Sequence, residues 1–170
     1  MQHILIVGPR GVGKSTLIRA LLQALHLPID GIITKKEAPL SDGFSPVYIH
    51  RYGTERQFGP GNCIGLCRDG HSIAFPESFE RVSAFMPFPS DHVIVFDELG
   101  FLESDAPRFT EAVLRTLDEA PLVIAAVRDK ATPFLNAVRS HPKAAVYRIS
   151  EENRDELREM LVGKLTGLSL

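Results

Sequence analysis

A glycine-rich segment near the start of the chain constrains the fold more than any other feature. Residues 8–15 read GPRGVGKS, which matches the pattern G-x-x-x-x-G-K-[ST] in full, and they follow the apolar run 4–7. Glycines permit backbone conformations that a Cβ would block, so successive N–H groups can turn inward around a phosphate, and a following helix adds its positive N-terminal end. An apolar strand before the pattern and a helix after it therefore predict a phosphate-binding loop (P-loop).

Two side chains of this loop have distinct predicted tasks. Lys14 is expected to reach the β- and γ-phosphates of a nucleotide, and Ser15 is expected to ligate Mg²⁺. For Arg10 two interpretations stay open, a side chain folded over the nucleotide and one that faces solvent. The residues of this segment predicted to bind the nucleotide are Gly8, Pro9, Arg10, Gly11, Val12, Gly13, Lys14, Ser15 and Thr16.

After the loop, segments in which apolar residues have the spacing of a helix alternate along the chain with the apolar runs of buried strands. Residues 13–25 place apolar side chains three and four positions apart, which is typical of a helix with one buried face, and Pro28 ends it. Further strands are predicted over 29–34, 92–96, 122–127 and 144–149, and helices are predicted to begin near Pro76, Asp105, Thr132 and Ser150. Phe85 and Met160 are expected on the buried faces of two of these helices. The alternation predicts a three-layer α/β P-loop fold, a mainly parallel sheet with helices on both faces.

Residues 37–75 have a different character from the rest of the chain. Prolines and glycines there separate short apolar runs such as 47–49 and 63–66, a pattern of short strands and turns. We interpret this stretch as a short antiparallel insertion attached to the α/β core. With 170 residues, of which 44% are hydrophobic and 24% charged, the whole chain 1–170 is expected to form a single nucleotide-binding domain.

Charge and hydropathy argue against several classes of partner. The chain has 19 basic and 21 acidic residues and no Lys/Arg-rich block, so nucleic acid is not expected as a partner. No apolar stretch approaches the ~20 residues that cross a bilayer, and no leader precedes the first strand, so the protein is expected to be cytoplasmic, without a membrane partner. Cys63 and Cys67 lack the second ligand pair of a structural zinc site and are expected to be free thiols. The sequence does not identify a protein partner.

The strand predicted over 92–96 ends in two acids, Asp97 and Glu98. An acid in this place holds Mg²⁺ in P-loop enzymes through its water shell, so Asp97 is the second predicted metal residue. Glu98 is expected on the neighbouring side of the cleft, where it would orient or deprotonate the water that attacks the γ-phosphate. The alternative is that both are helix-capping or solvated acids in a loop. Ligands bind at the carboxyl ends of strands in such sheets, which favours the catalytic interpretation.

Arg128 follows the strand predicted over 122–127. P-loop proteins with an adjacent Asp and Glu usually place an additional strand between the loop strand and the acidic strand, and 122–127 is the candidate. Arg128 would then neutralise charge in the transition state, with a surface arginine as the alternative. Residues 128–131 read RDKA, where a guanine-reading N-K-x-D motif is expected. The sequence therefore favours ATP or several nucleotides over a strict GTPase switch.

Over most of its length the chain resembles the THEP-type nucleoside-triphosphatases, a family of small P-loop proteins. Residues 97–100 read DELG where that family has Asp-Glu-Ile-Gly, and 153–155 read NRD, the family's triplet after its last strand. The resemblance implies Mg²⁺-dependent hydrolysis of ATP, GTP and related nucleotides with loose base preference. The loop after the last strand commonly lies beside the base in P-loop folds, which would put Asn153 and Arg154 there. A role in starting the last helix is the alternative for both residues.

Two departures from the family pattern are also visible. The family generally has a basic residue after Asp-Glu-Ile-Gly, where this chain has Phe101. Its second strand usually leads to an Arg-x-Gly-Phe element, of which only 42–44, reading DGF, remains. Both differences fall near the predicted cleft and the insertion, so the rate or the natural substrate of this chain can differ from the family's.

The sequence thus predicts a Mg²⁺-dependent enzyme that hydrolyses the β–γ bond of ATP or GTP, with Glu98, Lys14 and Arg128 as catalytic residues. Two other classes stay open. A P-loop small-molecule or nucleotide kinase would use 37–75 to hold a phosphoryl acceptor, although the stretch from 127 to 144 is short for a large arginine-rich lid. A nucleotide-dependent accessory protein with little turnover would dock onto a partner through the same insertion.

Overall fold

The computed structural model describes residues 1–166, and within them the chain forms one sheet of eight strands. The strands are β1 (His3–Gly8), β2 (Ile29–Lys36), β3 (Ser45–Arg51), β4 (Cys63–Arg68), β5 (His71–Ala74), β6 (Val93–Leu99), β7 (Leu122–Arg128) and β8 (Ala144–Arg148). The α-helices are α1 (Lys14–Ala24), α2 (Pro76–Ser83), α3 (Pro107–Glu119), α4 (Pro133–Arg139) and α5 (Arg154–Thr166), and a 3₁₀-helix, η1 (Leu102–Asp105), precedes α3.

The strands lie in the order β5-β4-β3-β2-β6-β7-β1-β8. Strands β2, β6, β7, β1 and β8 pair in parallel, and β3, β4 and β5 extend the sheet antiparallel from the edge of β2. Strand β7 lies between β1 and β6, as predicted for 122–127. The predicted parallel core with an antiparallel insertion is therefore confirmed, and the insertion is a continuation of the same sheet.

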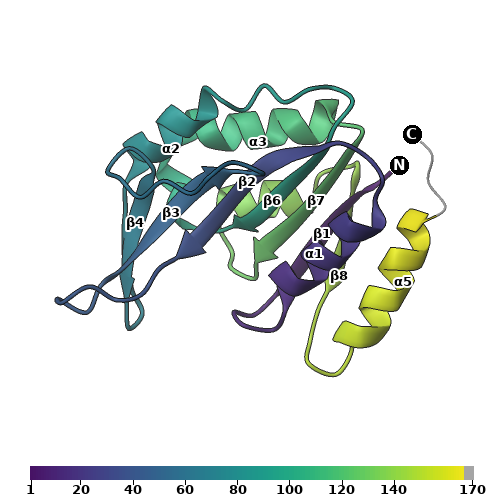
Figure 1. Cartoon of the computed structure of the whole chain (residues 1–170), viewed down its shortest axis with the longest axis horizontal. Coiled ribbons are helices and arrows are strands. Elements are labelled where there is room, and N and C mark those ends of the chain that lie inside the picture. The colour runs from purple at the N-terminus through teal and green to yellow at the C-terminus, as the bar shows by residue number, and fades with distance from the viewer. Residues whose placement is uncertain (167–170) are drawn as a thin grey trace.

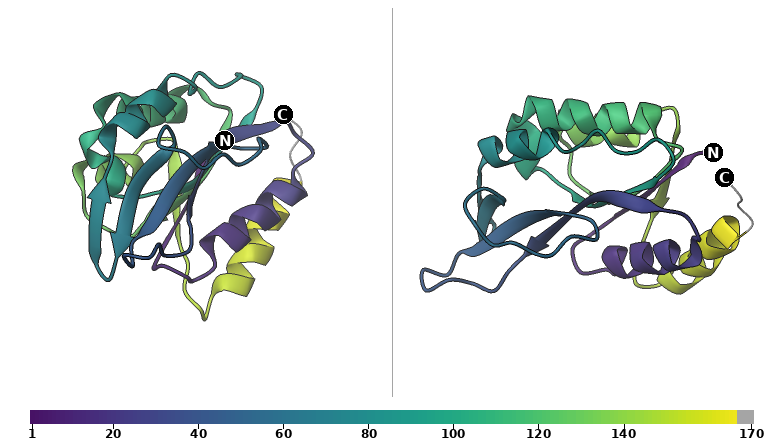
Figure 2. Two further views of the ribbon diagram at one scale, coloured as in Figure 1. Left: turned by 60° about the vertical axis from the view of Figure 1, so that its left-hand side comes forward. Right: turned by 45° about the horizontal axis from the view of Figure 1, so that its top comes forward.

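Helices cover both faces of the parallel strands (Figure 1). Helices α1 and α5 lie side by side on one face, and α2 and α3 lie on the other (Figure 2). Because successive side chains of a strand point to opposite faces, β1 contributes to two cores. Ile4 and Ile6 pack in the core beneath α1 and α5, whereas Leu5 and Val7 pack in the core beneath α2, α3 and α4. All six residues of β1 are therefore buried, with one core on each face of the strand.

Local sequence explains where several helices begin. Gly13 precedes α1 with φ of +108°, in the region that favours glycine over residues with a Cβ. The hydroxyl of Thr132 caps α4 by accepting a hydrogen bond of 3.1 Å from the Leu135 amide. Helix α5 begins at Arg154, three residues later than a cap at Ser150 predicts. The Ser150 hydroxyl accepts a bond of 3.3 Å from the Asn153 amide, in the turn that leads into the helix.

Two residues predicted to be buried are exposed. Phe85 is 63% exposed because α2 ends at Ser83, which leaves Phe85 beyond the face that the helix buries. Met160 is 42% exposed because the buried stripe of α5 follows a four-residue spacing, through Leu157, Leu161 and Leu165. Among the helices of residues 1–166, none has both the length and the apolar character needed to cross a membrane.

Candidate nucleotide site

A cleft of about 670 Å³ opens at the carboxyl ends of the central parallel strands. The P-loop forms one wall, the ends of β6 and β7 form the floor, and the turn between β4 and β5 forms the far wall. Strands β1, β7, β6 and β2 are neighbours in the sheet, so residues at their carboxyl ends, far apart in the sequence, meet at this edge. The cleft therefore occupies the place where a parallel α/β sheet binds ligands.

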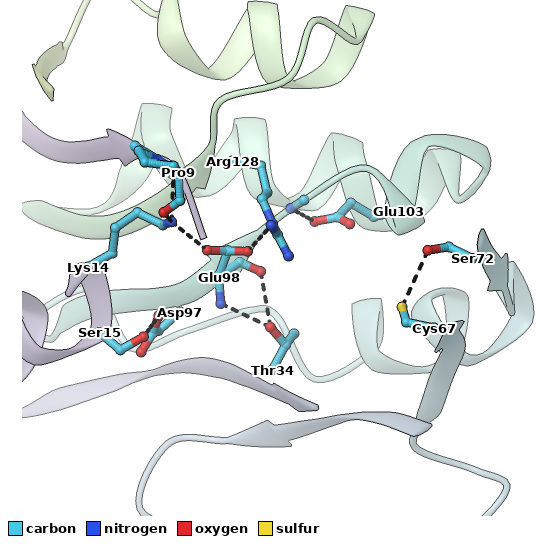
Figure 3. A network of polar contacts seen from close by, with 12 residues as sticks. Pro9, Lys14, Ser15, Thr34, Cys67, Ser72, Asp97, Glu98, Glu103 and Arg128 are labelled. Atoms are coloured by element: carbon cyan, nitrogen blue, oxygen red, sulfur yellow. Dashed lines mark hydrogen bonds and ion pairs between the residues drawn. The ribbon is translucent and has the colours of Figure 1, made fainter. Parts of the chain in front are cut away.

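Lys14 is buried at the base of this cleft, with only 5% of the residue exposed. Its ammonium donates hydrogen bonds to the carbonyl oxygens of Gly8 at 2.9 Å and Pro9 at 2.7 Å. The third partner is the carboxylate of Glu98, whose Oε2 lies 3.2 Å from Nζ (Figure 3). The positive charge is thus held in the loop by its own backbone and balanced by the acid predicted to be catalytic.

Ser15 and Asp97 meet beside this pair. The Ser15 hydroxyl donates a hydrogen bond of 2.9 Å to Oδ1 of Asp97. Burial raises the pKa of Asp97 above its ordinary value, and the nearby charge of Glu98 raises it further, against the lowering effect of the Ser15 bond. A hydroxyl and a desolvated carboxylate are oxygen donors of the kind that Mg²⁺ prefers, and a cation would relieve the cost of the buried negative charge. The two residues therefore fit a magnesium ion.

Glu98 stands at the centre of the site and is held on two sides. Its Oε1 lies 2.5 Å from Nε of Arg128, while Oε2 faces Lys14. The side chain of Thr34 holds the main chain of Glu98: Oγ1 accepts a bond of 3.0 Å from the Glu98 amide and donates one of 3.2 Å to its carbonyl. The carboxylate of Glu98 is therefore oriented by two cations and a fixed backbone.

Arg128 lies in the cleft and not on a remote surface loop. Strand β7 pairs with β1 in parallel so that Arg128 stands opposite Gly8, the first residue of the P-loop. The guanidinium reaches from this position to Glu98. The structure thus brings together four of the residues singled out in the sequence, namely Lys14, Asp97, Glu98 and Arg128, with Ser15 beside them.

Thr34 and Glu103 were not singled out from the sequence. Thr34 belongs to β2, and only the parallel pairing of Ile33 with Asp97 carries it next to Glu98. Glu103, on η1, is buried in the wall of the cleft and accepts a hydrogen bond of 2.5 Å from the Gly100 amide. Burial raises its pKa to about 7, and the charge of Glu98 contributes in the same direction. The only signal in the sequence is an acid close behind the Asp-Glu pair, which also suits a solvated turn.

Arg10, Asn153 and Arg154 lie farther from this centre. Arg10 is exposed and lines the cleft. Asn153 shapes the turn after β8: its Oδ1 accepts a bond of 2.8 Å from the Ser150 amide, and its Nδ2 donates one of 2.9 Å to the Arg148 carbonyl. Asn153 and Arg154 are not part of the cleft lining, and they follow the strand that borders β1.

Cys63 and Cys67 are free thiols on β4. Cys67 lines the cleft, and its Sγ accepts a hydrogen bond of 3.4 Å from the Ser72 hydroxyl. Cys63 lines a separate cavity beside α2. Among residues 1–166, no group of three or more His, Cys, Asp or Glu side chains is arranged to hold a metal ion.

Known proteins share both the sequence pattern and the fold. A family model described as NTPase matches residues 3–162. A cancer-related nucleoside-triphosphatase from Homo sapiens is 28% identical, with 92% of each chain covered. The nucleoside-triphosphatase THEP1 from Thermotoga maritima is 26% identical, over 96% of this chain and 95% of the relative.

Two solved structures resemble this one. The solution structure of a human cancer-related nucleoside triphosphatase aligns over 100% of both chains with a TM-score of 0.67 and 26% identity. The crystal structure of THEP1 from Aquifex aeolicus aligns over 96% of this chain and 98% of that one, with a TM-score of 0.63 and 21% identity, a likeness of fold. The family model spans nearly the whole chain, from β1 into α5, and confirms the resemblance noted in the sequence. The chain therefore belongs to the NTPase family, in its THEP-type branch.

Proposed function

We propose that this protein is a Mg²⁺-dependent nucleoside-triphosphatase that hydrolyses the β–γ bond of ATP and GTP with loose base preference. The observation that carries the proposal is the position of Glu98, whose carboxylate lies 3.2 Å from the P-loop lysine and beside the Ser15–Asp97 pair. The names of the relatives, which are nucleoside-triphosphatases, support the reaction class.

The binding residues act before the chemistry. The P-loop amides and Lys14 would surround the β- and γ-phosphates, and Ser15 and Asp97 would hold Mg²⁺. A bound Mg²⁺ supplies positive charge to the phosphate oxygens. Lys14 must then turn from Glu98 toward the phosphates, which leaves one oxygen of Glu98 free. Nucleotide binding thus prepares the base by removing one of its two cations.

Glu98 would then act on water. Its free oxygen accepts a proton from the water while the water oxygen bonds to the γ-phosphorus, and the bond from phosphorus to the β–γ bridging oxygen breaks. The products are the nucleoside diphosphate and inorganic phosphate. Arg128, which already reaches the centre of the cleft, would offset the negative charge on the γ-phosphoryl group. Asn153 and Arg154 would border the base, and the absence of a guanine-reading motif in 128–131 supports loose base preference.

One observation favours a kinase as the second candidate. The cleft does not end at the P-loop side but continues to Cys67 and Ser72 at the far wall, where a phosphoryl acceptor would have room. In that case Glu98 would take the proton of an acceptor hydroxyl in place of water.

The test is release of inorganic phosphate from ATP and GTP by the purified protein, with and without Mg²⁺ and with no acceptor added. The proposal expects phosphate and diphosphate in equal amounts, only with Mg²⁺, at similar rates for both nucleotides. If diphosphate forms only after a hydroxyl compound is added, and no inorganic phosphate is released, the kinase is favoured. Tight nucleotide binding with no product under any condition would favour an accessory protein.

A further inference from the structure

Glu103 is a buried acid in the nucleotide cleft that hydrolysis as described above does not use. Only 3% of it is exposed, and its Oε1 accepts a hydrogen bond of 2.5 Å from the Gly100 amide. A glutamine would accept that bond without the cost of burying an ionisable group. Burial raises the pKa of Glu103 to about 7, so its charge changes near neutral pH. The ability to become negative is what distinguishes this side chain from an amide here.

Arg128 lies between Glu103 and Glu98 (Figure 3). On one side its Nε is 2.5 Å from Oε1 of Glu98. On the other, Arg128 and Glu103 converge over Gly100: a Cβ placed on that glycine would be 3.7 Å from Cγ of Arg128 and 3.6 Å from Oε2 of Glu103. Both side chains thus approach the same glycine, and the charge of Arg128 lowers the pKa of Glu103, while Glu98 is the ion-pair partner of Arg128.

The other elements around Glu103 supply few competing charges within the cleft. Helix η1 packs against α2, α3 and β5. The titratable and charged residues on these elements are His71 on β5, Glu77, Glu80 and Arg81 on α2, Arg108, Glu111, Arg115, Asp118 and Glu119 on α3, and Asp105 on η1 itself. Of these, His71 alone lines the cleft. Glu80 pairs with Arg108 at 3.6 Å, and Arg81 with Glu77 at 3.9 Å. The charged side chains that act most strongly on the pKa of Glu103 are Glu98, which raises it, and Arg128, which lowers it.

We propose that Glu103 is a positioning residue for Arg128: its carboxylate draws the guanidinium away from Glu98, which frees Glu98 for water and turns Arg128 toward the γ-phosphate. This inference rests on the proposed roles of Glu98 and Arg128 in hydrolysis. Lys14 leaves Glu98 when a triphosphate binds, but Arg128 would still neutralise the base and occupy its second oxygen. A second negative group beside Arg128 relieves this restraint without entering the reaction itself.

The kinetic test uses Glu103→Gln, which keeps an acceptor for the Gly100 amide and removes the charge. At about pH 8 we expect kcat for ATP hydrolysis to fall about tenfold, the scale for a residue that supports a catalytic group, with KM within about twofold. At about pH 6, where Glu103 of the parent protein is itself protonated, the two proteins should converge. Asp105→Asn, which removes an exposed charge from the same short helix, is the matched control and should follow the parent at every pH. His71→Gln checks that the imidazole in the cleft does not cause the pH effect.

A double-mutant cycle separates this role from a general loss of structure. If Glu103 acts through Arg128, Glu103→Gln should have no further effect on kcat in an Arg128→Gln background. Thermal unfolding should show that Glu103→Gln is at least as stable as the parent at about pH 8, because a buried charge has been removed. An equal loss of kcat in both backgrounds would overturn the inference.

The ¹⁵Nε resonance of Arg128, assigned with Arg128→Lys, gives a readout that needs no nucleotide. We expect this resonance to shift with pH around 7 in the parent and to stay constant in Glu103→Gln. If the resonance is equally pH-independent in both, the inference fails. If the parent hydrolyses ATP but Glu103→Gln matches its kcat at every pH, the inference fails while the proposed function stands. If the parent releases no phosphate, the proposed function fails, and the resonance still reports whether the two side chains interact.

Discussion

The carboxylate of Glu98 lies 3.2 Å from the ammonium of Lys14, so the predicted base forms an ion pair with the predicted phosphate-binding residue. In the proposed mechanism both groups would need a different partner, Lys14 the phosphates and Glu98 the water. An entering triphosphate would supply the new partner for Lys14. Binding and activation of the base would then be coupled through a single ion pair.

Lys14→Ala should lose most of the affinity for triphosphate. We expect a loss on the order of 2–5 kcal/mol, the scale for removing one partner of a buried charge pair. Calorimetric titration with ATP measures it, and Lys35→Ala, which removes an exposed lysine of β2, is the control and should bind as the parent does. Equal affinity of Lys14→Ala and the parent would contradict the P-loop assignment.

Glu98→Gln should separate catalysis from binding. The amide keeps the size of the side chain but cannot take a proton from water, so kcat should fall by roughly 10² or more, with affinity for the Mg²⁺ complex of ATP within a few-fold. Phosphate release and calorimetry measure the two quantities. A variant with the parent's kcat would remove Glu98 from the role of base.

Asp97→Asn should behave differently, because Asp97 is assigned to the metal. The charge that compensates Mg²⁺ is lost, so nucleotide affinity in the presence of Mg²⁺ should fall along with turnover, while affinity without Mg²⁺ should change little. Titrating ATP with and without Mg²⁺ checks this. Equal effects under both conditions would argue that Asp97 supports the loop and does not hold the metal.

Thr34→Val should lower kcat without a large change in KM. Valine has nearly the shape of threonine but can neither accept from the Glu98 amide nor donate to its carbonyl, so the main chain of the base is less well held. We expect a loss of about tenfold, with activity retained in Thr34→Ser, which keeps the hydroxyl. Steady-state kinetics of the three proteins measure kcat and KM. If Thr34→Ser is as slow as Thr34→Val, the methyl group and not the hydroxyl of Thr34 is the important part of the side chain.

His3 should make the fold less stable in acid. Its Nε2 faces the Leu117 carbonyl at 2.6 Å and its Nδ1 accepts a bond of 3.0 Å from the Val123 amide, so the buried ring is neutral. Burial lowers the pKa of His3 below 6.5, and the nearby His141 and Lys143 lower it further, against the raising effect of the Leu117 bond. The unfolded chain then takes up a proton first as the pH falls, so the stability contributed by His3 is complete above pH 6.5 and is lost below it.

Urea unfolding between about pH 7 and pH 5 measures this effect. The free energy of unfolding should fall with pH in the parent, and the fall should be smaller in His3→Gln. His26→Gln, which changes an exposed histidine, serves as the control and should keep the parent's slope. Identical slopes in all three proteins would exclude His3 as the titrating group.

Most of the fold was predictable because its signals are local. A few neighbouring residues are enough to recognise the P-loop pattern, the apolar strands and the prolines at 76, 107 and 133 that start helices. The structure forms the corresponding elements at these positions. The periodicity misplaces two side chains: Met160, which is 42% exposed beside the buried stripe of α5, and Phe85, which lies beyond the end of α2. Phe85 follows the spacing of α2 in the sequence, but the helix stops at Ser83. The spacing of apolar residues does not show at which residue a helix ends.

The sequence by itself determined that a P-loop precedes a helix and that two acids end a buried strand, since both depend on contiguous residues. Only the tertiary structure decided that Thr34 holds the backbone of Glu98, that Arg128 faces it and that Glu103 is buried behind Arg128. These relationships depend on which strands pair and in which register. The surroundings of a carboxyl group also set its charge state: the fold removes Glu103 from water, and this burial raises its pKa to about 7.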